Sequence, residues 1–265
     1  MSETAASCAQ IALRAAADGA NIVLLAKTDT PDPRLPGTIH TAAQAIRDAG
    51  GQVLAHVGDV RDEHHVRAAV AAAVERFGGI DVLVNNASAI ALQNPGELPL
   101  KRYDLMMDVN ARGTFTLTSH ALPHLLRSGN AHVLTLSPRL CDDRRWLRAH
   151  APYTVSKFAM TMITLGVAEE HRGTALAANC LWPRTVVATA ASALTRGKEA
   201  VRRVSRTPQI MADAAWEVLT RPAADCTGNT FVDEEVLREA GVTDFAPYRA
   251  DPASSEPLAV DIFLD

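Results

Sequence analysis

Short apolar runs alternate with longer amphipathic stretches along this chain. The apolar runs predict strands at residues 20–26, 52–57, 80–84, 131–137 and 175–181. The stretches between them predict helices at residues 9–18, 41–49, 62–77, 101–127, 153–171 and 210–219. Strands that alternate with helices throughout predict an α/β fold, a doubly wound parallel sheet with helices on both faces in three layers.

Composition narrows the class further. With 265 residues and 48% hydrophobic content the chain can bury a sizeable core, and we expect one domain over residues 1–265. A formal net charge of −4 shows no basic bias toward nucleic acid, and no apolar run approaches the roughly 18 residues that span a membrane. Residues 1–4 show no signal sequence, so we expect a cytoplasmic protein.

No metal site is expected. The four cysteines are far apart and form no C-x-x-C pair. His120 and His124 have the i, i+4 spacing of metal ligands, but the Glu of H-E-x-x-H is missing, and we interpret them as helix-surface residues.

The candidate chemistry centres on Tyr153 and Lys157, four residues apart on one predicted helix and therefore on one face. A phenol titrates near pH ~10, so it exchanges protons at neutral pH only if a nearby positive charge stabilises the phenolate. Lys157 can supply that charge. Upstream, a buried strand ends at Ser137, another runs into Asn85-Asn86-Ala87-Ser88, and Asn110 lies in the helical stretch after it.

In this order, these pieces resemble the short-chain dehydrogenase/reductase family, with Ser88 where the family usually has Gly. The sequence at residues 26–28 and 36–39 resembles that of the hydroxysteroid-dehydrogenase-like branch of the family. The resemblance implies a Rossmann-like fold and hydride transfer between a nicotinamide cofactor and a small-molecule carbonyl or secondary alcohol. It also implies four catalytic roles: Tyr153 as proton donor, Lys157 lowering the Tyr pKa and holding the nicotinamide ribose, Ser137 bonding the developing alkoxide, and Asn110 positioning a relay water.

The same resemblance implies where the cofactor binds. Lys27 follows the predicted strand at 20–26, whose end contacts the adenosine ribose of the cofactor in this family. A cation there favours a 2′-phosphate, so we expect NADP, with NAD possible. Asp59 is implied to contact the adenine amino group, with the backbone of Val60 beside the ring. The remaining cofactor residues implied are Asn86, Ala87, Tyr153, Lys157, Pro183, Val187 and Thr189, with residues 190–207 as a substrate lid.

The N-terminal stretch departs from the family pattern. The family's first strand is absent, and Ser2, Ala6 and Cys8 align with three glycines that let the backbone approach a pyrophosphate. One explanation is a segment missing upstream. The other is a catalytically silent homologue that acts as a binding or assembly protein because its dinucleotide loop is degenerate.

Three further expectations concern partners. Residues 138–150 carry four arginines, which either recognise an anionic substrate or form a solvated face balanced by nearby acidic residues, and the solvated face is favoured. The resemblance implies a homodimer or homotetramer built on the helices that start near Lys101 and Tyr153. The tail, residues 234–265, is expected to be ordered and interfacial.

Overall fold

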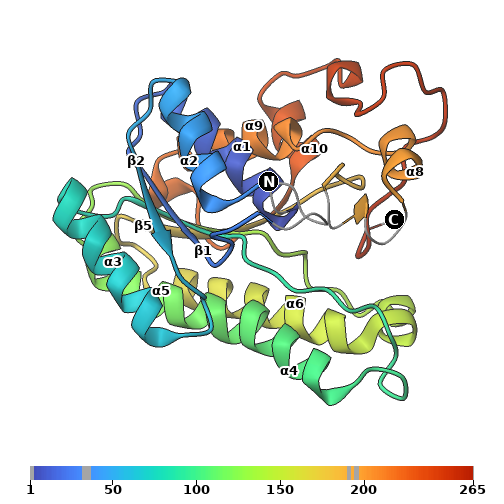
Figure 1. Ribbon diagram of the computed structural model, residues 1–265, viewed down its shortest axis with the longest axis horizontal. Helices are drawn as coiled ribbons and strands as arrows, with labels where there is room; N and C mark the ends of the chain where they lie inside the picture. The colour runs from blue at the N-terminus through green and yellow to red at the C-terminus, as the bar shows by residue number, and fades with distance from the viewer. Residues whose placement is uncertain (1–2, 32–36, 190–191, 194–196, 265) are drawn as a thin grey trace. The chain divides into compact units, whose positions relative to one another are not determined.

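The computed structural model describes residues 3–31, 37–189, 192–193 and 197–264, in which strands and helices alternate (Figure 1). The strands are β1 (Ile22–Ala26), β2 (Val53–Val57), β3 (Val82–Asn85), β4 (Ala131–Thr135), β5 (Leu176–Trp182) and β6 (Thr230–Val232). The α-helices are α1 (Glu3–Ala17), α2 (Ile39–Asp48), α3 (Glu63–Phe77), α4 (Leu100–Met107), α5 (Gly113–Leu125), α6 (Arg144–Glu170), α8 (Lys198–Arg203), α9 (Gln209–Leu219) and α10 (Asp233–Glu239). The α/β, Rossmann-like class predicted from the sequence is confirmed.

The chain divides into two compact units, each assembled from separated segments. Unit 1 contains residues 1–57, 183–220 and 232–265, and unit 2 contains residues 58–182 and 221–231. The single domain over residues 1–265 stays a prediction.

In unit 1, β1 pairs in parallel with β2, with Ile22 opposite Val53. A capping box at Thr38 starts α2 two residues earlier than predicted, because its hydroxyl accepts from the Thr41 N–H and so satisfies a free donor of the first turn. Gly51 links α2 to β2, and a Cβ there would lie 2.7 Å from the Cβ of Ala16 on α1. Only Gly lets these elements approach so closely.

In unit 2 the strand order is β3-β4-β5-β6, and β3, β4 and β5 pair in parallel. All residues of β4 and β5 are buried, as expected for a parallel sheet covered by helices. Figure 1 shows α4, α5 and α6 side by side, and both α4 and α5 contact α6. Leu83, Leu125 and Val133 form part of the core between the sheet and these helices.

Two predicted segments differ from the structure. The helix expected over 101–127 is divided by a π-helical turn, η1 (Asp108–Arg112), which contains Asn110. The helix expected from residue 153 is preceded in α6 by a helical stretch that starts at Arg144, because Asp143 caps it by accepting from the Arg145 N–H at 2.8 Å.

The helix predicted at the start of the chain is present, and it begins at Glu3 rather than residue 9. Ala6 and Cys8 lie inside α1, and Ser2 lies outside the described residues. Among the described residues, β1 pairs only with β2, and β3 pairs only with β4. The pairing agrees with the expectation that the family's first strand is absent from this stretch.

Candidate functional site

A break in α6 places Tyr153 and Lys157 in the first turns of the helical run that follows it. His150 has non-helical angles (φ −149°, ψ 40°), and Pro152 follows. Because Pro lacks an N–H and suits the first turn of a helix, the run that carries the pair starts here. Tyr153 is 5% exposed and Lys157 is 3% exposed. Both side chains are therefore shielded from bulk water.

The ammonium of Lys157 has polar and aromatic neighbours among the described residues. Its Nζ donates to the main-chain oxygen of Leu136 at 2.7 Å and contacts the sulfur of Met160 at 3.5 Å. The indole ring of Trp182 lies over it, with 5.1 Å from Nζ to the ring centroid. A buried ammonium needs such partners to offset the water it has lost. They hold the charge beside the carboxyl end of β4.

Ser137 follows directly after Leu136 and is 1% exposed. Its Oγ makes no hydrogen bond to a nitrogen or oxygen of the described residues. The thiol of Cys180 is a close neighbour: burial raises its pKa, and hydrogen bonding to Ser137 acts in the opposite direction. A buried hydroxyl without an oxygen partner is a donor that a substrate oxygen could use.

Asn110 ties three segments of unit 2 together. Its Nδ2 donates to the Ala89 oxygen and to Ser156 Oγ, both at 3.0 Å, and its Oδ1 accepts from the Ala89 N–H at 2.7 Å. Ser156 Oγ in turn donates to the main-chain carbonyl oxygen of Tyr153 at 2.8 Å. The π-helical turn is thereby linked to the helix that carries the Tyr-Lys pair.

The strand end of β3 is fixed by Asn85, whose Nδ2 donates to the hydroxyls of Thr118 at 3.0 Å and Thr135 at 3.3 Å. These bonds join β3 to β4 and α5. Asn86 and Ala87 follow, both partly buried, in the loop that Asn110 holds through Ala89.

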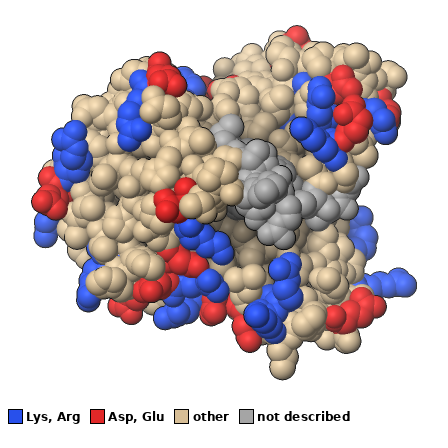
Figure 2. Space-filling view, viewed as in Figure 1, with Lys and Arg blue, Asp and Glu red and all other residues tan. Residues whose placement is uncertain are grey.

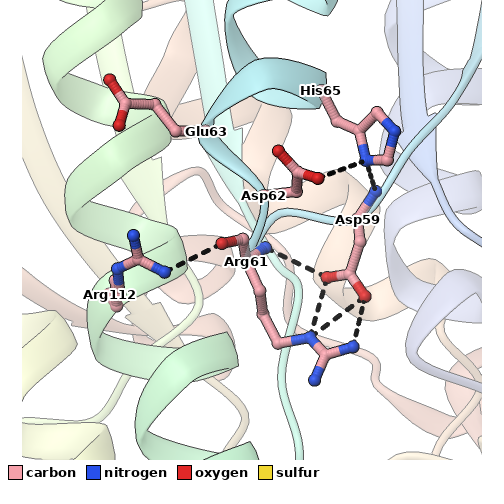
Figure 3. Close-up of a pocket in the computed structure, with 6 residues that line it drawn as sticks. All are labelled: Asp59, Arg61, Asp62, Glu63, His65 and Arg112. Carbon is pink, nitrogen blue, oxygen red and sulfur yellow. Dashed lines mark hydrogen bonds and ion pairs between the residues drawn. The ribbon is translucent and has the colours of Figure 1, made fainter.

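Asp59 lies in the loop after β2 and is bound by Arg61 (Figure 3). The two line a pocket of about 410 Å³, whose other lining residues are Asp62, Glu63, His65 and Arg112. Val60 packs against Gly113, where an added Cβ would lie 3.0 Å from Val60 Cγ2. Of the residues that line this pocket, Asp59 is a predicted cofactor residue. Arg61, which binds it, was not predicted.

In unit 1, Lys27 is exposed directly after β1. The acidic neighbour Asp29 is engaged by His40, with 2.6 Å between Oδ1 and Nε2. Pairing of Asp29 reduces its ability to accept a ribose hydroxyl.

The segment 183–189 of unit 1 is held by the tail and by Arg206. The Val186 N–H donates to the Ala259 oxygen at 2.9 Å, and the Ala188 N–H donates to the Arg206 oxygen at 2.8 Å. The hydroxyl of Thr189 lies 3.2 Å from Ser192 Oγ, so it is engaged within its own turn. The tail is ordered, as expected, over the described residues to 264, and its role in an interface stays a prediction. Of the predicted lid, residues 190–191 and 194–196 lie outside the described residues.

The predicted site residues divide between the units. The residues in unit 2 are Asp59, Val60, Asn86, Ala87, Asn110, Ser137, Tyr153 and Lys157. The residues in unit 1 are Lys27, Pro183, Val187 and Thr189. All four predicted catalytic residues thus belong to one unit, where hydrogen bonds link their segments.

Two arginines of residues 138–150 have partners, and so does Arg184. Arg145 binds Asp143, with 2.7 Å between Nε and Oδ2, and Arg139 donates to the Thr230 oxygen at 2.9 Å. Arg184 binds Glu235 at 2.9 Å. On the face shown in Figure 2, acidic and basic side chains are interspersed. These pairs favour the balanced, solvated face over a dedicated anion site.

Sequence reasoning missed Arg61, Ser156 and Trp182. Each lies within four residues of a predicted site residue, and that proximity was the available signal. Only the fold shows that Trp182 covers Lys157 and that Ser156 bonds Asn110.

Within the part of the chain that the structure describes, no group of three or more His, Cys, Asp or Glu side chains could hold a metal ion. His120 contacts Glu63 at 3.3 Å on the surface of α5. None of the helices in the described residues is long and apolar enough to cross a membrane.

Comparisons with known proteins agree with the geometry. A family model described as short chain dehydrogenase matches residues 7–199. Hydroxysteroid dehydrogenase-like protein 2 of Xenopus tropicalis is 49% identical over 96% of this chain, and that of Rattus norvegicus is 51% identical over 96%. The chain spans 60% of the Xenopus protein and 48% of the rat protein. A crystal structure of a short chain dehydrogenase from Mycobacterium thermoresistibile is 49% identical, with a TM-score of 0.92 over 98% of this chain and 91% of that one.

Proposed function

This chain belongs to the short-chain dehydrogenase family, and from that premise we propose that it is an oxidoreductase that transfers hydride between NADP(H) and a small carbonyl or secondary alcohol. The observation that carries the proposal is the pair of buried side chains in unit 2, Ser137 and Lys157. There the Ser137 hydroxyl has no oxygen or nitrogen partner among the described residues, and the Lys157 ammonium is held beside the same strand end.

The nicotinamide supplies the hydride, and the residues of this chain handle the oxygen and the proton. Ser137 donates a hydrogen bond to the carbonyl oxygen, which stabilises the negative charge that develops on it. Tyr153 gives that oxygen a proton through its hydroxyl, and the Lys157 ammonium stabilises the phenolate left behind. Oxidation of an alcohol reverses these roles.

Asn110 is assigned to a relay water that returns the proton to Tyr153. Both hydrogens of its side-chain amide are already donated, to Ala89 and Ser156. A water at this position would therefore donate to an oxygen of Asn110. The bond to Ser156 also keeps the π-helical turn in place against α6.

NADP is proposed over NAD because Lys27 is exposed at the end of β1 and Asp29 is engaged by His40. A cation at this position favours a 2′-phosphate, whereas a free carboxylate favours a 2′-hydroxyl. Asp59 and Val60 are assigned to the adenine, and Asn86, Ala87, Tyr153, Lys157, Pro183, Val187 and Thr189 to the nicotinamide ribose and ring. The cytoplasmic location stays a prediction.

A homodimer or homotetramer is proposed from the surface of α5 and α6. Phe115 on α5 is 59% exposed, and Val155 and Met162 on α6 are 49% and 64% exposed. The last two lie seven residues apart and so share one helix face. Exposed large apolar side chains on two helices that contact each other are typical of an interaction surface.

The second candidate is a catalytically silent homologue that acts as a binding or assembly protein. It is favoured by α1, which is helical across Ala6 and Cys8, where the family has glycines that approach a pyrophosphate. This candidate predicts a folded protein without cofactor affinity.

The deciding experiment titrates the purified protein with NADPH, and separately with NADH, and follows nicotinamide fluorescence. Tight NADPH binding supports the oxidoreductase. No binding to a folded protein overturns it and supports the silent homologue. With binding established, Tyr153→Phe should abolish turnover of a screened carbonyl substrate while circular dichroism stays unchanged; retained turnover would refute the role of Tyr153.

A further inference from the structure

In unit 1 the main chain of Arg206 runs beside the segment 186–188. The Arg206 N–H donates to the Val186 oxygen at 3.0 Å, and the Arg206 oxygen accepts from the Ala188 N–H at 2.8 Å. These two bonds make a parallel bridge between Arg206 and Val187. Because such a bridge uses the peptide groups on either side of Val187, the peptide groups of Val187 itself point away from Arg206.

The side chain of Arg206 fixes that bridge to the start of α10. It is only 7% exposed, and its Nη1 donates to Glu234 Oε2 at 2.5 Å. The ring of Phe245 lies 5.2 Å from its Cζ. A buried guanidinium needs an anionic partner to offset the water it has lost, and an aromatic face adds to that stabilisation. The position of Arg206 therefore depends on Glu234.

The same helix start fixes the residues that precede Val187. Asp233 Oδ1 accepts from the Arg184 N–H at 2.7 Å and from the Glu234 N–H at 2.6 Å. Asp233 thus holds Arg184 directly, whereas Glu234 holds Ala188 through Arg206. Two consecutive residues of α10 therefore fix both ends of the segment that contains Val187.

Arg238 has the same two partners as Arg206 but lies elsewhere. Its Nη2 donates to the other carboxylate oxygen, Glu234 Oε1, at 2.7 Å, and its Cζ lies 4.8 Å from the centre of the Phe245 ring. The side chain is 58% exposed, and its bond to Glu234 joins positions i and i+4 of α10. That bond is local to one helix, so Arg238 is a matched control for Arg206.

We propose that Arg206 is a positioning residue for the nicotinamide end of the cofactor: its pairing with Glu234 keeps the segment 186–188 in the conformation that binds the ring. This inference rests on the proposed NADP(H) function, which assigns Val187 and Thr189 to that end. A segment that is already fixed loses little conformational entropy when the ligand binds, so its affinity is higher. Without the pairing, the ligand itself would have to order the segment.

The test measures dissociation constants by calorimetry for NADPH and for 2′-phospho-ADP-ribose, which lacks only the nicotinamide ring. Arg206→Met keeps an unbranched apolar stem and removes the charge. The affinity for NADPH should then fall roughly tenfold, which corresponds to about 1.4 kcal/mol, while the affinity for the fragment stays within about twofold. The preference for NADPH over the fragment should therefore fall about tenfold as well.

Three further variants make the outcome specific. Arg238→Met removes the exposed arginine from the same carboxylate and ring, and it should leave both constants unchanged. Arg206→Lys keeps the charge without the planar fork and should restore part of the preference for NADPH. Glu234→Gln keeps the shape of the partner and removes its charge, so it should weaken that preference in the same direction as Arg206→Met. Melting temperatures of all the variants check that each is folded.

The outcomes separate the two proposals. If the wild-type protein binds NADPH and folded Arg206→Met keeps the wild-type ratio of the two constants, the role of Arg206 is overturned and the oxidoreductase proposal stands. Equal losses for both ligands also overturn it, because they indicate a general disturbance of unit 1, and so does an equal effect of Arg238→Met. If Arg206→Met does not fold, an unchanged ratio in Glu234→Gln overturns the role. If the folded wild-type protein binds neither ligand, the proposed function itself fails and the inference fails with it.

Discussion

The indole ring of Trp182, the last residue of β5, covers the ammonium of Lys157 at 5.1 Å, and both side chains are more than nine-tenths buried. A cation over an aromatic face is stabilised by about 2 kcal/mol or more when water is excluded. Trp182 therefore supports the position of Lys157 as well as the core of unit 2.

Replacing Trp182 tests that support. We expect Trp182→Leu to lower the free energy of unfolding by about 2–4 kcal/mol, because it removes both packing and the aromatic face. Trp182→Phe keeps an aromatic face, so its free energy of unfolding should fall less than that of Trp182→Leu. Urea denaturation measures both variants. Equal losses for Leu and Phe would show that the ring face contributes nothing.

His132 on β4 should make the protein acid-sensitive. It is 1% exposed, and burial lowers its pKa, opposed by the hydrogen bond to the Arg221 oxygen at 3.0 Å. Since the unfolded chain binds protons more readily, this contribution to stability is present above about pH 6.5 and is lost as the pH falls. The free energy of unfolding, measured between pH 8 and 5, should fall less in His132→Gln than in the wild-type protein. The exposed His64→Gln should behave like the wild-type protein, and an unchanged slope in His132→Gln would contradict the assignment.

Asp233, the first residue of α10, should make the protein less stable as the pH rises, which is opposite to the effect of His132. Its carboxyl is fully buried, Oδ2 has no hydrogen-bond partner among the described residues, and burial raises its pKa to about 6. The folded state therefore binds the proton more tightly. The stability it contributes is present below the ordinary pKa near 4 and is lost as the pH rises through about 6. Asp233→Asn keeps an oxygen for the N–H groups of Arg184 and Glu234.

We accordingly expect Asp233→Asn to gain stability relative to the wild-type protein between pH 5 and 8. Melting curves across that range provide the measurement. A difference between variant and wild type that does not vary with pH would show that Asp233 does not titrate there.

The exposed apolar surface of α5 and α6 should carry the oligomer. The double variant Phe115→Glu, Met162→Glu places charges on that surface and should reduce the assembly to a monomer, because burying unpaired charges is costly. Sedimentation velocity measures the change. Leu140→Glu, at a residue of similar exposure that lies on neither α5 nor α6, is the matched control. A double variant that sediments like the wild-type protein would refute this interface.

The arginines of residues 144–148 should not recognise substrate. Arg145 is bound to Asp143, and Arg144 is exposed, as expected for a solvated face. The double variant Arg144→Ala, Arg145→Ala should therefore leave KM for an anionic thioester substrate within about twofold, since exposed ion pairs contribute little. A clear rise in KM with kcat unchanged would instead favour anion recognition.

Local signals predicted much of the fold. The helix expected over residues 62–77 is α3, whose cap Asp62 accepts from the His64 N–H at 2.8 Å and which ends at Gly78, where φ is 87°. Such features depend on residues close together in sequence. The helical turn at residues 144–149 was not predicted, because the pattern around it indicates a charged face as well as it indicates a helix start, and only the structure shows Asp143 as the cap.

The sequence by itself determined the alternation of strands and helices, the family, and the placement of Tyr153 and Lys157 on one face, because each depends on periodicity or on a spacing of a few residues. Tertiary structure decided what surrounds that pair. Asn110 reaches Ser156 across 46 positions, Lys157 reaches Leu136 across 21, and Trp182 arrives from another strand. Contacts over such separations depend on how strands order and helices pack, and no local pattern encodes them.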